Sequence, residues 1–172
     1  MIIMPYKAAV IIVSDRAFEG IREDETFPLL NKILLENGFQ VWEKIIIPDN
    51  FQHITENLTT LSDQVQLILT SGGTGLSSRD VTPEATLSVA QKTVPGIPEF
   101  LRMESLKKTK YSALSRGVCV IREKCLIVNL PGSPKGAVEH LEFLLPLLPH
   151  ALTQINEPRI QDADHRNGDV KN

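Results

Sequence analysis

Short apolar runs alternate along the chain with segments whose apolar residues recur at helical spacing. Three runs rich in β-branched residues predict strands buried on both faces, at residues 8–13, 39–47 and 65–70. Between them, apolar residues at helical spacing predict helices over residues 27–36 and 51–61. This alternation of short strands and helices is typical of an α/β fold with a parallel sheet and right-handed crossovers.

The second half of the chain predicts further elements of both kinds. Helices are expected over 82–90 and 99–108, and strands over 112–120 and 125–130. The link between these two strands is too short for a helical crossover, so the pair should be antiparallel and the sheet mixed. A last helix is expected from Lys135, kinked or stopped by Pro146 and Pro149.

Composition favours one soluble domain. A chain of 172 residues that is 42% hydrophobic and 23% charged can bury a real core without disulfides or metals. We expect the domain to span residues 1–156 and a polar tail to follow over 157–172. The net charge of -3 argues against a nucleic-acid partner held through its phosphates. Apolar stretches are too short for a membrane span or a secretory leader, so a cytoplasmic protein is expected.

Thiol and imidazole chemistry is not indicated. The two cysteines, Cys119 and Cys125, lack the spacing of a metal site and are expected to be buried thiols in a reducing compartment. The four histidines share no spacing, which favours structural or exposed roles for all of them.

Polar or glycine-rich groups follow four of the predicted strands. They are Ser14-Asp15, Asp49, the loop 71–75 and the segment 129–133. In open α/β sheets, ligands bind in the crevice beyond the carboxyl ends of parallel strands, where these groups should converge. Within the loop, Gly72, Gly73, Thr74 and Gly75 would let backbone N–H groups approach an anion closely. A plain glycine-rich turn is the equally weighted alternative.

Charged residues near these loops suggest a nucleotide site. Asp49 and Asp80 beside a phosphate-binding backbone are a reasonable Mg²⁺ site, because this ion prefers one or two carboxylates together with substrate phosphates and water. Arg116 could form a fork to a phosphate, next to Ser115. Gly132 and Ser133, at the start of the last helix, could form a second anion site. Each of these residues could instead cap its own turn or lie on the surface.

Several runs, taken together and in this order, resemble one known family. They are TSGGTGLSSRDVTPEAT at 70–86, PGIPE at 95–99, LSRG at 114–117 and NLPGSPK at 129–135. This set is similar to the Mog and MoaB proteins of molybdenum-cofactor synthesis, which are related to the gephyrin amino-terminal domain. The resemblance extends to about residue 155. Motifs do not separate the two branches, although the 114–117 run and the long segment after Pro95 favour Mog.

The resemblance implies a three-layer α/β/α sandwich with a mostly parallel mixed sheet, usually assembled as a homotrimer. It implies a molybdopterin adenylyltransferase that uses Mg²⁺ and ATP to attach AMP to the terminal phosphate of molybdopterin, releasing pyrophosphate. A downstream enzyme would then insert molybdate. The family's acidic pair, with its catalytic and Mg²⁺-binding role, falls on Asp49 and Asp80. Its substrate contacts would map to Ser14, Asp15, Gly72, Gly73, Thr74, Gly75, Ser115, Arg116, Gly132 and Ser133.

One loop departs from the family pattern. Family members often have Ser-Gly or Lys-Gly closely after an Asp beyond the first strand, whereas here Asp24 is followed by Glu25-Thr26-Phe27-Pro28. The role of Asp24 is therefore open. Two alternatives remain for the whole chain: a catalytically idle molybdopterin-binding scaffold, and a flavodoxin-like nucleotide binder. The latter is disfavoured because aromatic residues make up only 5% of the chain.

Overall fold

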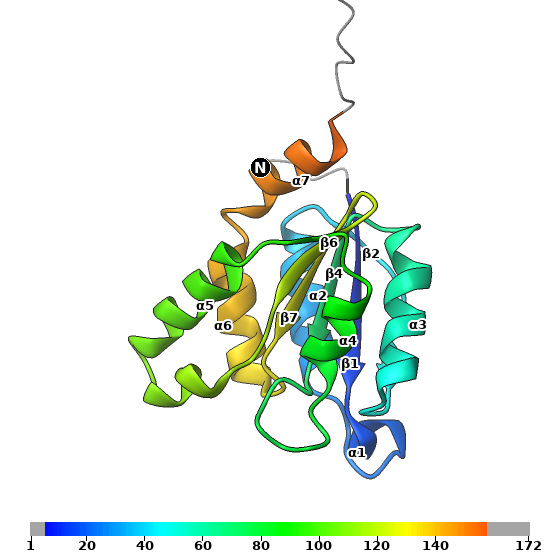
Figure 1. Ribbon diagram of the computed structural model, residues 1–172, viewed down its shortest axis with the longest axis vertical. Coiled ribbons are helices and arrows are strands. Elements are labelled where there is room, and N and C mark those ends of the chain that lie inside the picture. The colour runs from blue at the N-terminus through cyan, green and yellow to red at the C-terminus, as the bar shows by residue number, and fades with distance from the viewer. Residues whose placement is uncertain (1–5, 158–172) are drawn as a thin grey trace, which may run out of the picture.

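The computed structural model describes residues 6–157, which form a seven-stranded sheet between two layers of helices (Figure 1). The strands are β1 (Lys7–Val13), β2 (Gln40–Val41), β3 (Ile45–Ile47), β4 (Leu67–Ser71), β5 (Lys92–Thr93), β6 (Cys119–Arg122) and β7 (Cys125–Leu130). Their order across the sheet is β2-β1-β4-β7-β6-β5, and β3 also pairs with β1. The three-layer mixed α/β sandwich expected from the sequence is confirmed.

The helices divide between the two faces of this sheet. One face is covered by α2 (Thr26–Glu36), α5 (Gly96–Leu106), α6 (Pro134–Leu144) and α7 (Leu148–Asn156). The other is covered by α3 (Phe51–Ser62) and α4 (Thr82–Ser88). Two further elements are short: α1 (Asp15–Phe18), which follows β1, and the 3-10 helix η1 (Lys110–Leu114), which follows α5. Every helix of residues 6–157 is too short or too polar to cross a membrane.

The central strands are apolar along their whole length because both of their faces are covered. Along β1, Ala8, Val10 and Ile12 pack in the core beneath α2 and α6, whereas the intervening Ala9 and Ile11 pack beneath α3. β1 pairs in parallel with β2, β3 and β4, and β4 pairs in parallel with β7. A continuous apolar run is the sequence pattern expected of such a doubly covered parallel strand.

The antiparallel pair is confirmed, but its first strand begins at Cys119 rather than at residue 112 as predicted. β6 and β7 are antiparallel and pair Arg122 with Cys125 across a tight turn. Residues 110–114 instead form η1, whose first turn is capped by the Thr109 hydroxyl accepting from the Tyr111 N–H at 3.3 Å. Further along, the Arg102 guanidinium donates to the Gly117 carbonyl at 3.0 Å, a group that a longer strand would use in its ladder.

Other boundaries shift by smaller amounts. The strand predicted over 39–47 is split into β2 and β3, and the last helix stops before Pro146, whereas Pro149 lies in the first turn of α7. Thr82 and Pro83 begin α4 as expected from a proline near a helix start. Cys119 and Cys125 are buried free thiols, and burial raises the pKa of Cys119 to about 12. Residues 158–172 of the predicted tail lie outside the described residues.

Candidate active site

The carboxyl ends of β1, β3, β4 and β7 meet at one edge, and hydrogen bonds join the segments that leave them. The Ser14 N–H donates to the Ile47 carbonyl at 2.9 Å, joining the ends of β1 and β3. The Ser71 hydroxyl donates to the Pro131 carbonyl at 2.8 Å, joining the ends of β4 and β7. The four polar segments picked out in the sequence are therefore brought together as expected from a parallel sheet.

Two glycines of the loop after β4 adopt conformations that other residues avoid. Gly72 has φ 109° and Gly73 has φ 66°. A Cβ on Gly72 would lie 2.2 Å from the Val13 carbonyl oxygen, and a Cβ on Gly73 would lie 2.2 Å from the Thr82 hydroxyl. Glycine is therefore required at both positions, because the loop passes so close to β1 and to α4 that a side chain would not fit. At these two positions the loop exposes backbone atoms only.

Asp15 and Asp49 fix each other through reciprocal hydrogen bonds to the backbone. The Asp15 N–H donates to Asp49 Oδ2 at 3.1 Å, and the Asp49 N–H donates to Asp15 Oδ1 at 2.9 Å. The second oxygen of Asp15 forms an ion pair with Arg79. Ser14 caps α1 by accepting from the Ala17 N–H at 3.2 Å. These contacts hold the loop after β3 firmly against the loop after β1.

Asp49 and Asp80 form an electrostatically unfavourable pair. Burial raises the pKa of the Asp49 carboxyl, and the nearby charge of Asp80 raises it further. Asp49 Oδ1 would lie 3.2 Å from a Cβ on Gly73, and Asp80 Oδ2 accepts from the Ser77 N–H at 3.0 Å. A cation held between two such carboxylates would relieve their repulsion. Within residues 6–157, no group of three or more acidic, His or Cys side chains is placed to hold a metal ion.

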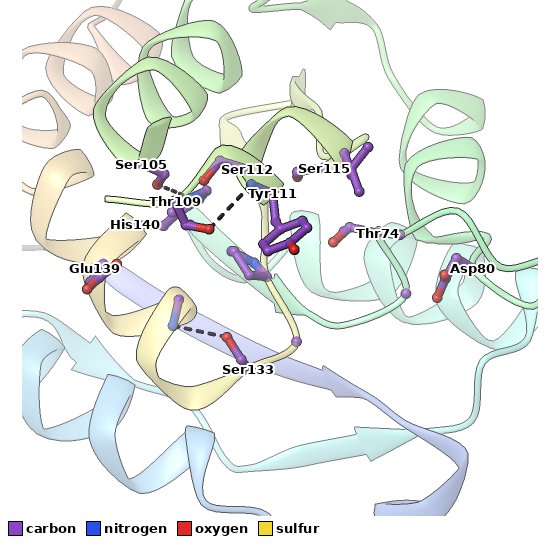
Figure 2. A pocket seen from close by; sticks show the side chains of 16 residues that line it. Thr74, Asp80, Ser105, Thr109, Tyr111, Ser112, Ser115, Ser133, Glu139 and His140 are labelled. Atoms are coloured by element: carbon purple, nitrogen blue, oxygen red, sulfur yellow. Dashed lines mark hydrogen bonds between the residues drawn. The ribbon is translucent and has the colours of Figure 1, made fainter. Parts of the chain in front are cut away.

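A cavity of about 500 Å³ opens beside the glycine loop (Figure 2). Seven of the residues singled out in the sequence line it: Gly73, Thr74, Gly75, Asp80, Ser115, Gly132 and Ser133. Ser133 also caps α6 by accepting from the Gly136 N–H at 3.1 Å. The N-terminal turn of α6 thus faces the same cavity as the glycine loop. Asp15, Asp49, Gly72 and Arg116 lie outside this lining, and Ser14 lines a smaller cavity of about 50 Å³.

The far end of the cavity is built from residues that sequence reasoning missed. Figure 2 shows Thr74 and Asp80 at one end and Glu139 and His140 at the other. The missed lining residues include Ser105, Thr109, Tyr111, Ser112, Glu139 and His140. His140 Nε2 lies 2.8 Å from the Ser105 hydroxyl, and burial lowers the pKa of His140 to about 4. This end is therefore rich in hydroxyl groups and carries a neutral imidazole at neutral pH.

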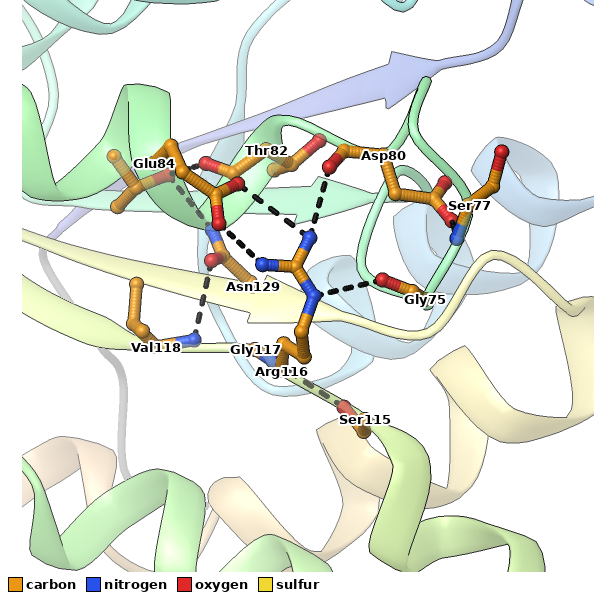
Figure 3. A network of polar contacts seen from close by, with 11 residues as sticks. Gly75, Ser77, Asp80, Thr82, Glu84, Ser115, Arg116, Gly117, Val118 and Asn129 are labelled. Atoms are coloured by element: carbon orange, nitrogen blue, oxygen red, sulfur yellow. Dashed lines mark hydrogen bonds and ion pairs between the residues drawn. The ribbon is translucent and has the colours of Figure 1, made fainter.

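Arg116 and Asp24 have structural contacts that the sequence did not reveal. Arg116 contacts the loop 75–80 and Glu84 (Figure 3). Asp24, with a side chain only 3% exposed, accepts from the Thr26 N–H at 3.0 Å and pairs with Lys44 at 3.1 Å. Asp24 therefore caps the first turn of α2, which accounts for an acidic residue in a loop without glycine.

Comparisons with known proteins agree with this geometry. Residues 9–150 match the family described as "Probable molybdopterin binding domain", and the chain belongs to that family. A curated Helicobacter pylori protein named molybdopterin adenylyltransferase is 40% identical over 164 residues, which cover 88% of this chain and 93% of that protein.

Solved structures of similar proteins carry both branch names. A Thermus thermophilus structure titled as the molybdopterin biosynthesis enzyme MoaB has a TM-score of 0.83 and 45% identity, covering 87% of this chain and 96% of its own. A Mycobacterium ulcerans structure titled as the molybdopterin biosynthesis Mog protein has a TM-score of 0.82 and 42% identity, covering 87% and 98%. The fold is therefore common to both branches.

The raised pKa of Asp49 predicts that this residue costs stability when ionised. A carboxyl whose folded-state pKa is raised stabilises the fold while protonated, and this contribution is lost as pH rises through the folded pKa. Asp49→Asn should therefore have a higher urea midpoint than the parent near neutral pH, and this gain should shrink in acid. Asp63→Asn, at the exposed end of α3, is the matched control. A lower midpoint for Asp49→Asn at neutral pH would contradict the electrostatic reading.

Gly75 offers a direct test of whether the loop is a binding cradle. A Cβ on Gly75 would lie 2.9 Å from Asp80 Oδ2, so Gly75→Val should displace that carboxylate. We expect Mg²⁺-ATP or molybdopterin to bind the folded variant at least ~10-fold more weakly, which is ~1.4 kcal/mol, by calorimetric titration. Gly96→Ala, where a Cβ meets no atom within 4 Å, should bind normally. Unchanged affinity in folded Gly75→Val would show that the loop is a plain turn and not a binding site.

Proposed function

We propose that this protein is a molybdopterin adenylyltransferase, which transfers AMP from ATP to the terminal phosphate of molybdopterin and releases pyrophosphate. The observation that carries the proposal is one cavity lined by the glycine loop, Asp80 and the N-terminal turn of α6. The curated relatives that bear this name are 40–44% identical over most of the chain, which supports the same activity here. This activity would give the protein a role in molybdenum-cofactor biosynthesis.

The two ends of the cavity suit the two ends of molybdopterin. The backbone at Gly73 and Gly75 would supply N–H groups for its phosphate, and the N-terminus of α6, just after Gly132 and Ser133, would supply a positive dipole end. The hydroxyl-rich end near Tyr111 provides polar partners and one aromatic ring for the pterin. We place the pterin there and the phosphate at the glycine loop.

ATP would approach from the side of Asp49, next to α1. Ser14, Asp15 and Gly72 lie at this junction of β1, β3 and β4 and are proposed to contact the nucleotide. Asp49 and Asp80 would hold the Mg²⁺ that accompanies ATP, and this ion would offset charge on the pyrophosphate leaving group. The attacking phosphate is already an anion, so the chain needs no general base. Orienting the two phosphates for in-line attack is then the main task of the loop.

This proposal is tested by incubating the purified protein with molybdopterin, ATP and Mg²⁺ and measuring pyrophosphate release. The parent should release pyrophosphate only when molybdopterin is present. Asp80→Asn and Asp49→Asn should each lose most of this activity, by ~10²-fold or more, while Asp63→Asn retains it. Binding of molybdopterin without any turnover by the parent would indicate the idle scaffold instead. Near-normal turnover by either aspartate variant would remove that residue from the catalytic pair.

Assembly and partners are proposed on the family resemblance. We propose that the protein works in the cytoplasm as a homotrimer and passes its adenylylated product to a molybdate-inserting enzyme. Light scattering should report about three times the 19.1 kDa chain mass. A stable monomer at micromolar concentration would contradict the trimer.

A further inference from the structure

Arg116 lies where the chain passes from η1 toward β6, yet its side chain is directed at a distant loop (Figure 3). Arg116 Nε donates to the Gly75 carbonyl at 2.8 Å, and Nη2 donates to the Asp80 carbonyl at 2.8 Å. The guanidinium also forms an ion pair with Glu84 of α4. Both carbonyls belong to the loop that carries the Asp80 carboxylate. The Arg116 side chain therefore holds both ends of this loop, at Gly75 and at Asp80.

Counting donors shows how little of Arg116 is left for a ligand. A guanidinium has five N–H donors in a fixed plane. Nε is used by Gly75, Nη2 by Asp80 and by Glu84 Oε2 at 3.5 Å, and Nη1 by Glu84 Oε1. At most one N–H is therefore free, whereas bidentate recognition of a phosphate requires two parallel N–H groups. A phosphate could take the fork only by displacing Glu84 or a backbone carbonyl.

The position of Arg116 is itself fixed from both sides. The backbone N–H of Arg116 donates to the Thr74 carbonyl at 3.0 Å. On the opposite side, Arg102 of α5 donates to the Gly117 carbonyl at 3.0 Å. The next residue, Val118, donates its N–H to the buried Asn129 Oδ1 at 3.1 Å. The segment therefore cannot slide without breaking contacts with α5, β7 and the glycine loop.

Glu84 matches the charge of Arg116 in this arrangement. Its carboxylate is about half exposed, and the hydrogen bond from Arg116 lowers the pKa of Glu84. An ionised Glu84 therefore neutralises the positive charge of Arg116. It also ties the first turn of α4 to the segment before β6.

We propose that Arg116 and Glu84 form a clamp that holds the Gly75–Asp80 backbone and so positions the Asp80 carboxylate opposite Asp49. Arg116 is then a positioning residue, in contrast to the phosphate fork expected from the sequence. The consequence for catalysis rests on the proposed function, whereas the ordering of the loop does not. A direct phosphate ligand and a clamp predict opposite effects of removing Glu84, because loss of its charge would free the guanidinium for a phosphate.

The test compares Arg116→Lys with Glu84→Gln and uses Arg122→Lys as the matched control. Arg122 also donates to a backbone carbonyl, that of Val89 at 3.2 Å, but lies away from the cavity lining. Two amides report on the loop: the Ser77 N–H, which donates to Asp80 Oδ2, and the Asp80 N–H, which donates to the Ser77 carbonyl. Their hydrogen exchange is measured alongside steady-state pyrophosphate release at varied ATP, molybdopterin and Mg²⁺.

We expect both clamp variants to exchange these two amides faster than the parent and the control. Both should lose about tenfold in kcat/KM for ATP and need more Mg²⁺ for half-maximal rate, with the KM for molybdopterin within about twofold. The clamp is overturned if exchange is unchanged in both variants. It is also overturned if Glu84→Gln keeps or raises activity while Arg116→Lys raises the KM for ATP or molybdopterin. A parent without activity would refute the proposed function, and exchange would still decide whether the clamp orders the loop.

Discussion

The parallel pairing of β1 with β3 and β4, and of β4 with β7, is the constraint on which the site depends. Parallel strands bring their carboxyl ends to the same edge, so the segments after four strands must share the space there. The Asn129 amide secures this edge inside the protein. It donates to the Thr70 and Thr86 hydroxyls at 2.9 and 3.0 Å and accepts from the Val118 N–H. One buried side chain thereby links β4, β7, α4 and the segment that carries Arg116.

Two features of this edge bear on what it can bind: the glycine loop, and the pair formed by Asp49 and Asp80. Gly72 and Gly73 adopt left-handed backbone conformations at points where a Cβ would meet neighbouring atoms. Asp49 is partly buried near a second carboxylate, which raises its pKa. Glycine adopts these backbone conformations without strain, so of the two features only the like-charge pair costs stability, and shifted pKa values of this kind cluster at functional sites. A bound cation would offset this cost, because it supplies charge opposite to that of the two aspartates.

Much of the fold could be predicted from local patterns, because each doubly covered strand is a continuous apolar run. Asp49 and the glycine loop were identified in the same way, since each follows a strand end. The hydroxyl-rich end of the cavity has no comparable signal, because its residues come from α5, η1, α6 and the segment before η1 rather than from strand ends. The role of Arg116 was also hidden, since Gly75 and Glu84 lie 41 and 32 residues away. Contacts at such separations leave no local signal in a single sequence.

We propose that Asp49 and Asp80 together hold the metal ion of a bound nucleotide. Mn²⁺ accepts the same oxygen ligands as Mg²⁺ and scatters X-rays anomalously, so it reports the position of the ion directly. The decisive measurement is an anomalous difference map from crystals soaked with Mn²⁺ and a non-hydrolysable ATP analogue. We expect one strong peak within coordination distance of both carboxylates and of the nucleotide phosphates. A nucleotide bound with its metal peak away from both aspartates would contradict it.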